Sequence, residues 1–244
     1  MISNKDRSGY FGASDTKYIV GNWSTKTFQK WWLQKLGILT TNFSNEYTMA
    51  GTNFEHKILD SLEIDGLEKD KQIIIEKYKL RVNLDGNTDR RIHEVKTYKY
   101  EKGFDLTKHK DYINQVQVQM YADKKREAEI DAYGLLEEDY KNYCRTIDKK
   151  RLEIFEIQYD DEFIEKVYLP RLKYLSECLT KGQIPKIEEY EKGELWYVLL
   201  FIKWKRIENI QRNWKKNKYK LWNKKQFTTI RKCNGYSRKF VKWN

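Results

Sequence analysis

Residues 80–97 read Leu80-Arg81-Val82-Asn83-Leu84-Asp85-Gly86-Asn87-Thr88-Asp89-Arg90-Arg91-Ile92-His93-Glu94-Val95-Lys96-Thr97. Two β-prone runs flank a Gly-Asn-Thr-Asp turn signal, so this stretch predicts a β-hairpin. Side chains alternate across a strand, so Glu94 and Lys96 point to one face and His93 points to the other. Asp85 is expected to close the first strand and to lie beside Glu94. The hairpin therefore brings two carboxylates and one amine together.

These three groups have the chemistry that metal-assisted phosphodiester hydrolysis requires. Asp85 and Glu94 offer the carboxylate oxygens that Mg²⁺ prefers as ligands. Lys96 would orient or deprotonate the attacking water and offset the charge that develops on the phosphate. An Asp…Glu-x-Lys pattern also arises by chance in a chain rich in Lys and Glu, so the pattern alone is a weak signal.

Two segments that precede the hairpin carry further polar groups. Gly51-Thr52-Asn53-Phe54-Glu55 opens a helical pattern and makes Glu55 a third candidate carboxylate. Nearer the start, Arg7 and Ser14 stand on either side of a loop that contains glycine. A cation and a hydroxyl on such a loop could grip a phosphate.

A fourth segment, residues 112–122, follows the hairpin and has a helical pattern. Gln117 and Tyr121 stand four positions apart in it, so they share one helical face. Together and in this order, the four segments resemble the PD-(D/E)xK nuclease superfamily and, within it, the lambda exonuclease or YqaJ-type viral recombinase family. The resemblance spans roughly residues 7 to 180 and rests on motifs at four places.

The resemblance implies a metal centre and its catalytic residues. In that family the equivalents of Asp85 and Glu94, with the main-chain carbonyl of Val95, coordinate Mg²⁺, for which Mn²⁺ can substitute. Glu55 matches a helix glutamate that lies near the metals. The equivalent of Lys96 is the catalytic lysine.

The resemblance also implies contacts with DNA. Arg7 and Ser14 match residues that bind the terminal 5′-phosphate, and Gln115 matches a glutamine of the same phosphate site. Gln117 and Tyr121 fit the Gln-x-x-x-Tyr motif of the related RecB-type nucleases. We therefore expect these five residues to lie along the path of the DNA.

The fold implied by the resemblance is α/β, a restriction-endonuclease-like core in which helices flank a central mixed β-sheet. Residues 1–185 would form this PD-(D/E)xK nuclease domain. Residues 186–244 would form a linker and a basic, aromatic-rich C-terminal extension.

The activity implied by the resemblance is Mg²⁺-dependent 5′-to-3′ digestion of double-stranded DNA ends, for recombination by single-strand annealing. In that family three subunits enclose the duplex and a single-strand annealing protein assists, so a homotrimer and such a partner are expected. A RecB- or Cas4-like DNA-processing nuclease is the alternative within this enzyme class. Three cysteines cannot supply the quartet of an iron–sulfur cluster, which counts against the cluster-bearing members.

The alternative outside this class is a non-catalytic DNA-binding or inhibitory protein on the same fold. Such a protein would have no need of Asp85, Glu94 and Lys96 together, so their presence argues against it. No apolar run reaches the roughly 18 residues that span a bilayer, and no signal sequence opens the chain. The expected location is the cytoplasm of a bacterium or of a phage-infected cell, without membrane contact.

Positive charge concentrates near the C-terminus. Residues 196–244 hold fifteen Lys and Arg against the single acid Glu208, a net charge of +14, which leaves −2 on the first 195 residues of a chain that totals +12. Tryptophans and tyrosines are interleaved with these cations, a mixture that suits phosphate neutralisation and base stacking. The alternative is a helix with the apolar side Trp196 to Ile207 packed on the core.

Coarser patterns predict the remaining elements. Thr25 is expected to cap a helix that ends at Gly37, with Trp31 and Trp32 in the core. The other expected elements are a helix from about Gln115 to Ala128, strands at Ile130–Leu136 and Leu152–Gln158, and a helix from about Asp161 to Lys181 ended by Gly182.

The three histidines are expected to take packing or surface positions. Strand alternation turns His93 away from Glu94. His56 and His109 are expected to be lone histidines.

Overall fold

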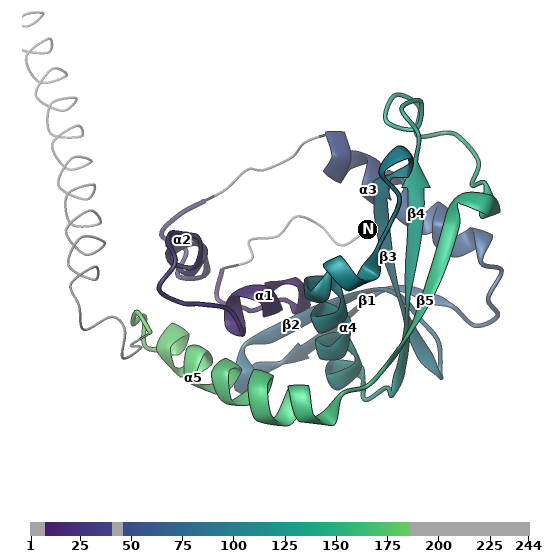
Figure 1. Ribbon diagram of the computed structural model, residues 1–244. Coiled ribbons are helices and arrows are strands. Elements are labelled where there is room, and N and C mark those ends of the chain that lie inside the picture. The colour runs from purple at the N-terminus through teal and green to yellow at the C-terminus, as the bar shows by residue number, and fades with distance from the viewer. Residues whose placement is uncertain (1–7, 41–45, 186–244) are drawn as a thin grey trace, which may run out of the picture. The chain divides into compact units, whose positions relative to one another are not determined.

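A computed structural model describes residues 8–40 and 46–185, and within them five strands form one mixed sheet (Figure 1). The spatial order is β1-β2-β3-β4-β5, and only β3 and β4 run parallel. The strands are β1 Glu68–Ile75, β2 Leu80–Asn87, β3 Arg91–Lys99, β4 Glu127–Leu135 and β5 Leu152–Gln158. A parallel pair needs a crossover, and α4, Lys110–Asp123, provides it between β3 and β4. The predicted central mixed sheet is thereby confirmed.

The predicted hairpin is present as β2 and β3, but its turn lies later than expected. Gly86 and Asn87 continue the strand because they pair with β1 on one side and with β3 on the other. The expectation that Asp85 closes the strand is therefore wrong. The turn is closed at Thr88, whose backbone N–H and hydroxyl both donate to the carbonyl of Arg91 at 2.9 and 3.0 Å.

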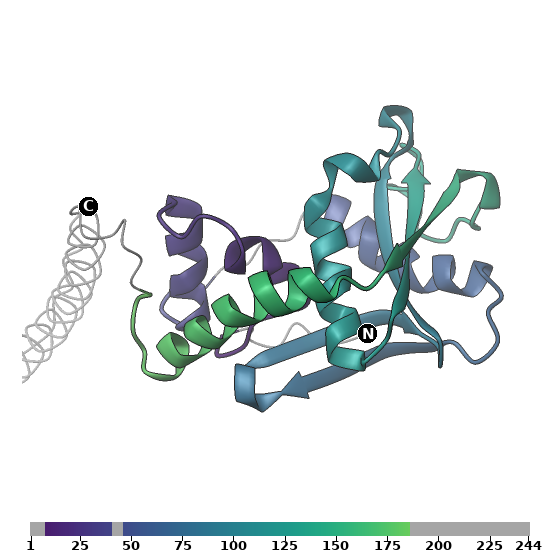
Figure 2. The ribbon, with the colours of Figure 1, turned by 60° about the horizontal axis from the view of Figure 1, so that its bottom comes forward.

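Strands β2 and β3 pair only at their hairpin end, through Gly86 with His93 and Asn87 with Ile92. Beyond this point the two strands separate, while β2 stays paired with β1 as far as Leu80. Figure 2 shows β1 and β2 leaving the rest of the sheet as a two-stranded ribbon. The separation leaves Asp85 and the residues from Glu94 onward on the two sides of an opening in the sheet.

Helices cover both faces of the sheet, as predicted (Figure 1). On one face, α3, Glu46–Ser61, packs Phe54 and Ile58 against Val95 and Tyr133. On the other face, α4 contacts β1, β2, β3 and β4. Burial of these apolar side chains is the main force that holds the layers together.

The N-terminal helices pack around a group of aromatic residues. Helix α1 spans Thr16–Ile19, and α2 spans Lys26–Lys35. The hydroxyl of Thr25 accepts a hydrogen bond from the N–H of Phe28 at 3.1 Å, the cap that the sequence predicts. Trp31 and Trp32 are buried in this core, again as predicted.

Two further expectations concern helix ends. The helix expected up to Ala128 ends at Asp123, because Lys124 takes a left-handed conformation (φ 56°) and Ala128 pairs with β3 inside β4. The expected last helix is present as a π-helical turn, Phe163–Tyr168, followed by α5, Leu169–Thr180. Gly182, at φ +63°, follows it in the conformation that favours glycine.

No helix among residues 8–40 and 46–185 combines the length and apolar character that crossing a membrane requires. The predicted C-terminal extension, residues 186–244, lies outside the described residues.

Candidate active site

The opening between β2 and β3 gathers the charged residues that the sequence singles out. The Asp85 carboxylate accepts a hydrogen bond from the backbone N–H of Val95 at 2.9 Å, which ties β2 to β3 where their ladder ends. Lys96 places its Nζ 2.5 Å from Oε1 of Glu94. Glu55 reaches the same charges from α3. The predicted carboxylates and the lysine therefore share one site.

Both oxygens of Glu94 are held by side chains of α4. The Gln115 amide donates to Oε1, and the Gln119 amide donates to Oε2. Gln119 is fully buried, and its amide also donates to the carbonyl of Asn83 on β2 at 3.3 Å. With only 2% of its surface exposed, the Glu94 side chain is held in one position by these hydrogen bonds.

The carboxylates of this site repel one another. Burial and then the charges of Glu94 and Glu55 raise the pKa of the Asp85 carboxyl well above 3.8. Burial and the charge of Glu94 likewise raise the pKa of Glu55. Three acidic groups thus crowd one partly buried site, an arrangement that a bound cation would relieve.

Lys96 stays charged in this setting. Burial acts against its ammonium form, but the neighbouring carboxylates of Glu94 and Asp85 outweigh burial and raise the pKa above 10.5. The ammonium group also lies 4.8 Å from the ring centre of Tyr112 on α4, a cation–π distance. Lys96 therefore acts here as a positive charge and hydrogen-bond donor.

The donor set fits a hard divalent cation. Asp85, Glu94 and Glu55 offer carboxylate oxygens, and Val95, between Glu94 and Lys96, offers its main-chain carbonyl. Mg²⁺ prefers such oxygen ligands, and burial together with the charges of Glu94 and Glu55 raises the pKa of Asp85. The chemistry of these groups therefore suits a divalent metal ion.

The residues expected at the 5′-phosphate fall in different places. Arg7 lies outside the described residues. Ser14 is exposed in the short 3₁₀-helix η1, Ala13–Asp15, whose loop is closed by a hydrogen bond of 2.7 Å from the N–H of Gly12 to Asp15. Gln115 contacts Glu94 and lies 3.3 Å from Nζ of Lys96, so it borders the charged site itself.

Gln117 and Tyr121 do not reach this site. The amide of Gln117 donates to the carbonyl of Gln158 and accepts from the N–H of Asp160, both at 2.7 Å, so it fastens α4 to the end of β5. Tyr121 is half-buried near Tyr78. Residues 115 and 119 take the helix face toward Glu94, which turns residue 117 to the opposite side.

We expect Gln117→Ala to lower the free energy of unfolding by about 2 kcal/mol or more, because it leaves a backbone C=O and N–H without partners. Its cleavage rate should be near that of the wild type. Gln119→Ala, a matched change two residues later on the helix face toward Glu94, should slow cleavage instead. Urea unfolding and nuclease assays on both variants would measure this, and a stable but inactive Gln117→Ala protein would contradict the assignment.

Gln119 and Tyr112 are the site residues that sequence reasoning missed. Gln119 stands four positions after Gln115, so the same helical spacing could have placed it on the Glu94 face. Tyr112 stands three positions before Gln115, a spacing that also places it on the Glu94 face of the helix. The phosphate-site match at Gln115 was thus the better guide to the active face of α4.

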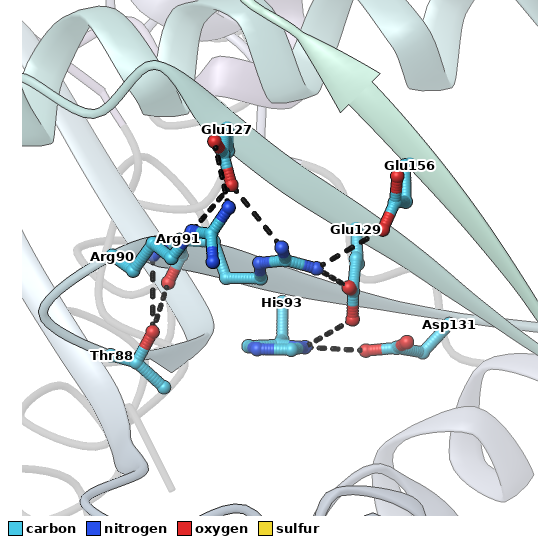
Figure 3. A network of polar contacts seen from close by, with 8 residues as sticks. All are labelled: Thr88, Arg90, Arg91, His93, Glu127, Glu129, Asp131 and Glu156. Atoms are coloured by element: carbon cyan, nitrogen blue, oxygen red, sulfur yellow. Dashed lines mark hydrogen bonds and ion pairs between the residues drawn. The ribbon is translucent and has the colours of Figure 1, made fainter.

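The histidines differ from the expectation in part. His56 has a carboxylate partner after all, with its Nε2 3.0 Å from Asp70 on β1, which helical spacing could not show. His109 packs against the ring of Tyr112. His93 is buried and points away from Glu94 as predicted, but it lies among charged residues of β3 and β4 (Figure 3).

No protein-family model matches this sequence, and no curated protein matches it. Solved structures do match its fold. An alkaline exonuclease from Laribacter hongkongensis is 19% identical, with a TM-score of 0.52 over 72% of this chain and 94% of the exonuclease. A phage-related exonuclease from Haemophilus somnus is 16% identical, with a TM-score of 0.53 over 71% of this chain and 96% of that chain.

The same Laribacter enzyme in complex with dAMP matches at 20% identity, with a TM-score of 0.51 over 72% of this chain and 94% of that chain. At such identities the likeness concerns the fold, and it agrees with the resemblance seen in the motifs. The chain therefore has the fold of these exonuclease structures, as the resemblance in the motifs predicts.

Proposed function

We propose that the protein is a Mg²⁺-dependent deoxyribonuclease that digests double-stranded DNA from its 5′ ends. The observation that carries this proposal is the meeting of Asp85, Glu94 and Lys96 at the opening of the sheet, with Glu55 beside them. The matched structures with this fold are exonucleases, which supports nucleic-acid hydrolysis.

In this proposal each residue of the site has a separate role in hydrolysis. Asp85, Glu94 and the Val95 carbonyl would hold the metal, with Glu55 nearby. When bound, Mg²⁺ would polarise the phosphate and favour a hydroxide nucleophile. Lys96, as an ammonium group, orients the attacking water and offsets charge on the phosphate. Gln115 and Gln119 keep the Glu94 carboxylate in place.

In this proposal Arg7, Ser14 and Gln115 recognise a terminal 5′-phosphate. Gln115 already borders the charged site, and Ser14 is exposed on a loop that leads to a helix. The guanidinium of Arg7 would supply a charge-assisted contact. From the resemblance we also propose that three copies of the chain form a ring around the duplex and that a single-strand annealing protein assists.

Digestion of matched DNA substrates tests this function. We expect linear duplexes with 5′-phosphate ends to be degraded faster than the same duplexes with 5′-hydroxyl ends, because the terminal contact is lost with the phosphate. Covalently closed circles should resist, since they have no end. Arg7→Ala should reduce the difference between the two linear substrates. Equal wild-type rates on both ends, or rapid cleavage of circles, would rule out the end-directed activity.

The basic C-terminal extension should strengthen DNA binding. A chain that ends at Glu194 loses the +14 segment and keeps a body near −2, so fewer counterions are released when DNA binds. We expect weaker binding and a shallower dependence of affinity on salt, with cleavage retained at low salt. Fluorescence anisotropy over a salt series measures both. If the truncated protein keeps the wild-type DNA affinity and salt dependence, the segment does not bind DNA. If the truncated protein is unfolded, the segment is part of the core.

A further inference from the structure

A second group of ligand-type side chains lies on the far side of β3 from the active site. His93 on β3 pairs in register with Glu129 on β4, and Asp131 follows two positions later on the same face. Figure 3 shows the three side chains pointing toward one another, with Arg91 above them. Glu94 and Lys96 alternate to the other face, so this group takes no part in the proposed hydrolysis.

The group is buried and incompletely satisfied. His93 is 1% exposed and Asp131 is 0% exposed. Oδ1 of Asp131 and Nε2 of His93 have no hydrogen-bond partner among the described residues. Within residues 8–40 and 46–185, His93 is also the one side chain that forms an ion pair with Asp131. A buried carboxylate with so little compensation is costly, which indicates that positive charge is lacking here.

The His93–Asp131 contact is at the long end of hydrogen-bond distances, and the spacing of the group also fits a metal site. Nδ1 of His93 lies 3.2 Å from Oδ2 of Asp131 and 3.4 Å from Oε2 of Glu129. Charge-assisted N–H···O hydrogen bonds are shorter, about 2.7–2.9 Å. Tetrahedral Zn²⁺ with bonds of about 2.0–2.1 Å separates neighbouring ligand atoms by about 3.3–3.4 Å. The two distances from Nδ1 agree with two edges of such a tetrahedron, and the three ligand atoms all lie within 4.8 Å of one another.

We propose that His93, Glu129 and Asp131 form a zinc-binding site, with Nδ1 and one oxygen of each carboxylate as ligands and water in the fourth position. An imidazole ligand favours Zn²⁺ over Mg²⁺, so this site and the nuclease site select different ions. Arg91 bonds the other oxygen of Glu129 and holds that carboxylate in its orientation, as outer partners of metal ligands do. Bound zinc would fasten β3 to β4 directly behind Glu94.

The experiment uses the full chain with Asp85→Asn and His56→Gln, which disable the nuclease site and the Glu55, His56 and Asp70 group. Protein stripped with a chelator is loaded with Zn²⁺ or Co²⁺ in excess Mg²⁺. Bound metal is measured by elemental analysis after gel filtration, geometry by the Co²⁺ absorption spectrum, and stability by thermal unfolding. We expect one zinc per chain, a tetrahedral Co²⁺ spectrum and a higher Tm.

Added ligand changes locate the bound metal. Asp131→Asn and Glu129→Gln, each made in the same background, should weaken zinc binding by at least about a hundredfold, since a lost ligand costs more than a lost outer partner. Glu156→Gln is the matched control, because Glu156 contacts Arg91 in the same network but does not reach His93. This control should bind zinc normally.

Two outcomes overturn the proposal: no zinc uptake by the background protein, or uptake that neither ligand change weakens. Either would make the group a chain of ion pairs from Arg91 through Glu129 and His93 to Asp131. If neither ligand variant folds, X-ray absorption on the zinc-loaded background protein decides. An imidazole nitrogen and carboxylate oxygens at about 2.0–2.1 Å support the site, and zinc without imidazole overturns it.

Discussion

Replacing Lys96 by alanine is expected to abolish metal-dependent cleavage, with a loss of at least about a thousandfold in rate. The ammonium group is held 2.5 Å from Glu94, and no other described side chain is placed to supply its charge at that point. The variant should still fold, because Lys96 is partly exposed, but it should be less stable, since Glu94 and Asp85 lose the charge that offsets them. Single-turnover assays with excess enzyme would measure the rate without interference from product release.

Lys99→Ala is the matched control for this change. Lys99 lies on the same strand, faces the other side of the sheet and has exposed acidic neighbours, Glu101 at 3.4 Å and Glu137 at 3.8 Å. Its variant should cleave at nearly the wild-type rate. A Lys96→Ala protein that keeps more than about a tenth of the wild-type rate would contradict the role assigned to this amine.

Replacing Asp85 by asparagine should abolish cleavage and, without metal, stabilise the fold. Asparagine keeps the acceptor for the N–H of Val95 but removes one of three mutually repelling carboxylates. Because the pKa of Asp85 is raised by folding, its ionisation costs stability as pH rises from its ordinary pKa of 3.8 through the raised folded value. The gain in Asp85→Asn should thus be largest near neutral pH and vanish below about pH 4.

Thermal unfolding in chelator across this pH range measures the effect, with Asp89→Asn as the control. Asp89 is an exposed carboxylate in the hairpin turn, so its change should leave both Tm and cleavage nearly unchanged. Adding Mg²⁺ should raise the Tm of the wild type and not that of Asp85→Asn. A variant less stable than the wild type in chelator would show that Asp85 is not in a repulsive cluster.

Much of the fold follows from local signals in the sequence. The strand at Leu152–Gln158 has the predicted ends, because its β-prone run pairs with β4 at seven consecutive positions. The cap at Thr25 and the glycines at helix ends depend on neighbouring residues alone, which is why the sequence shows them. The alternation that puts Glu94 with Lys96 and turns His93 away depends only on strand geometry.

What the sequence did not show depends on packing between distant elements. Gln115 with Gln119, and Gln117 with Tyr121, have the same spacing of four, so spacing cannot tell which pair meets the sheet. Strand β3 packs against one face of α4, and on that face Gln115 and Gln119 donate hydrogen bonds to Glu94. In the same way, the partner of His56 comes from β1.

The turn of the hairpin shows a similar limit. Gly86 and Asn87 have turn propensity, but pairing with β1 and β3 keeps them extended. The parallel neighbour β4 brings Glu129 and Asp131 to His93. Such contacts over long sequence separations are set by the tertiary fold and leave no local signal.

The central claim is that Asp85, Glu94 and Lys96 form one metal-dependent hydrolytic site. The most direct measurement compares the digestion of a linear, 5′-phosphorylated duplex by the wild type and Asp85→Asn, each in Mg²⁺ and in chelator, after both are shown to be folded. We predict digestion by the wild type in Mg²⁺ alone. Equal digestion by Asp85→Asn, or digestion that persists in chelator, would contradict it.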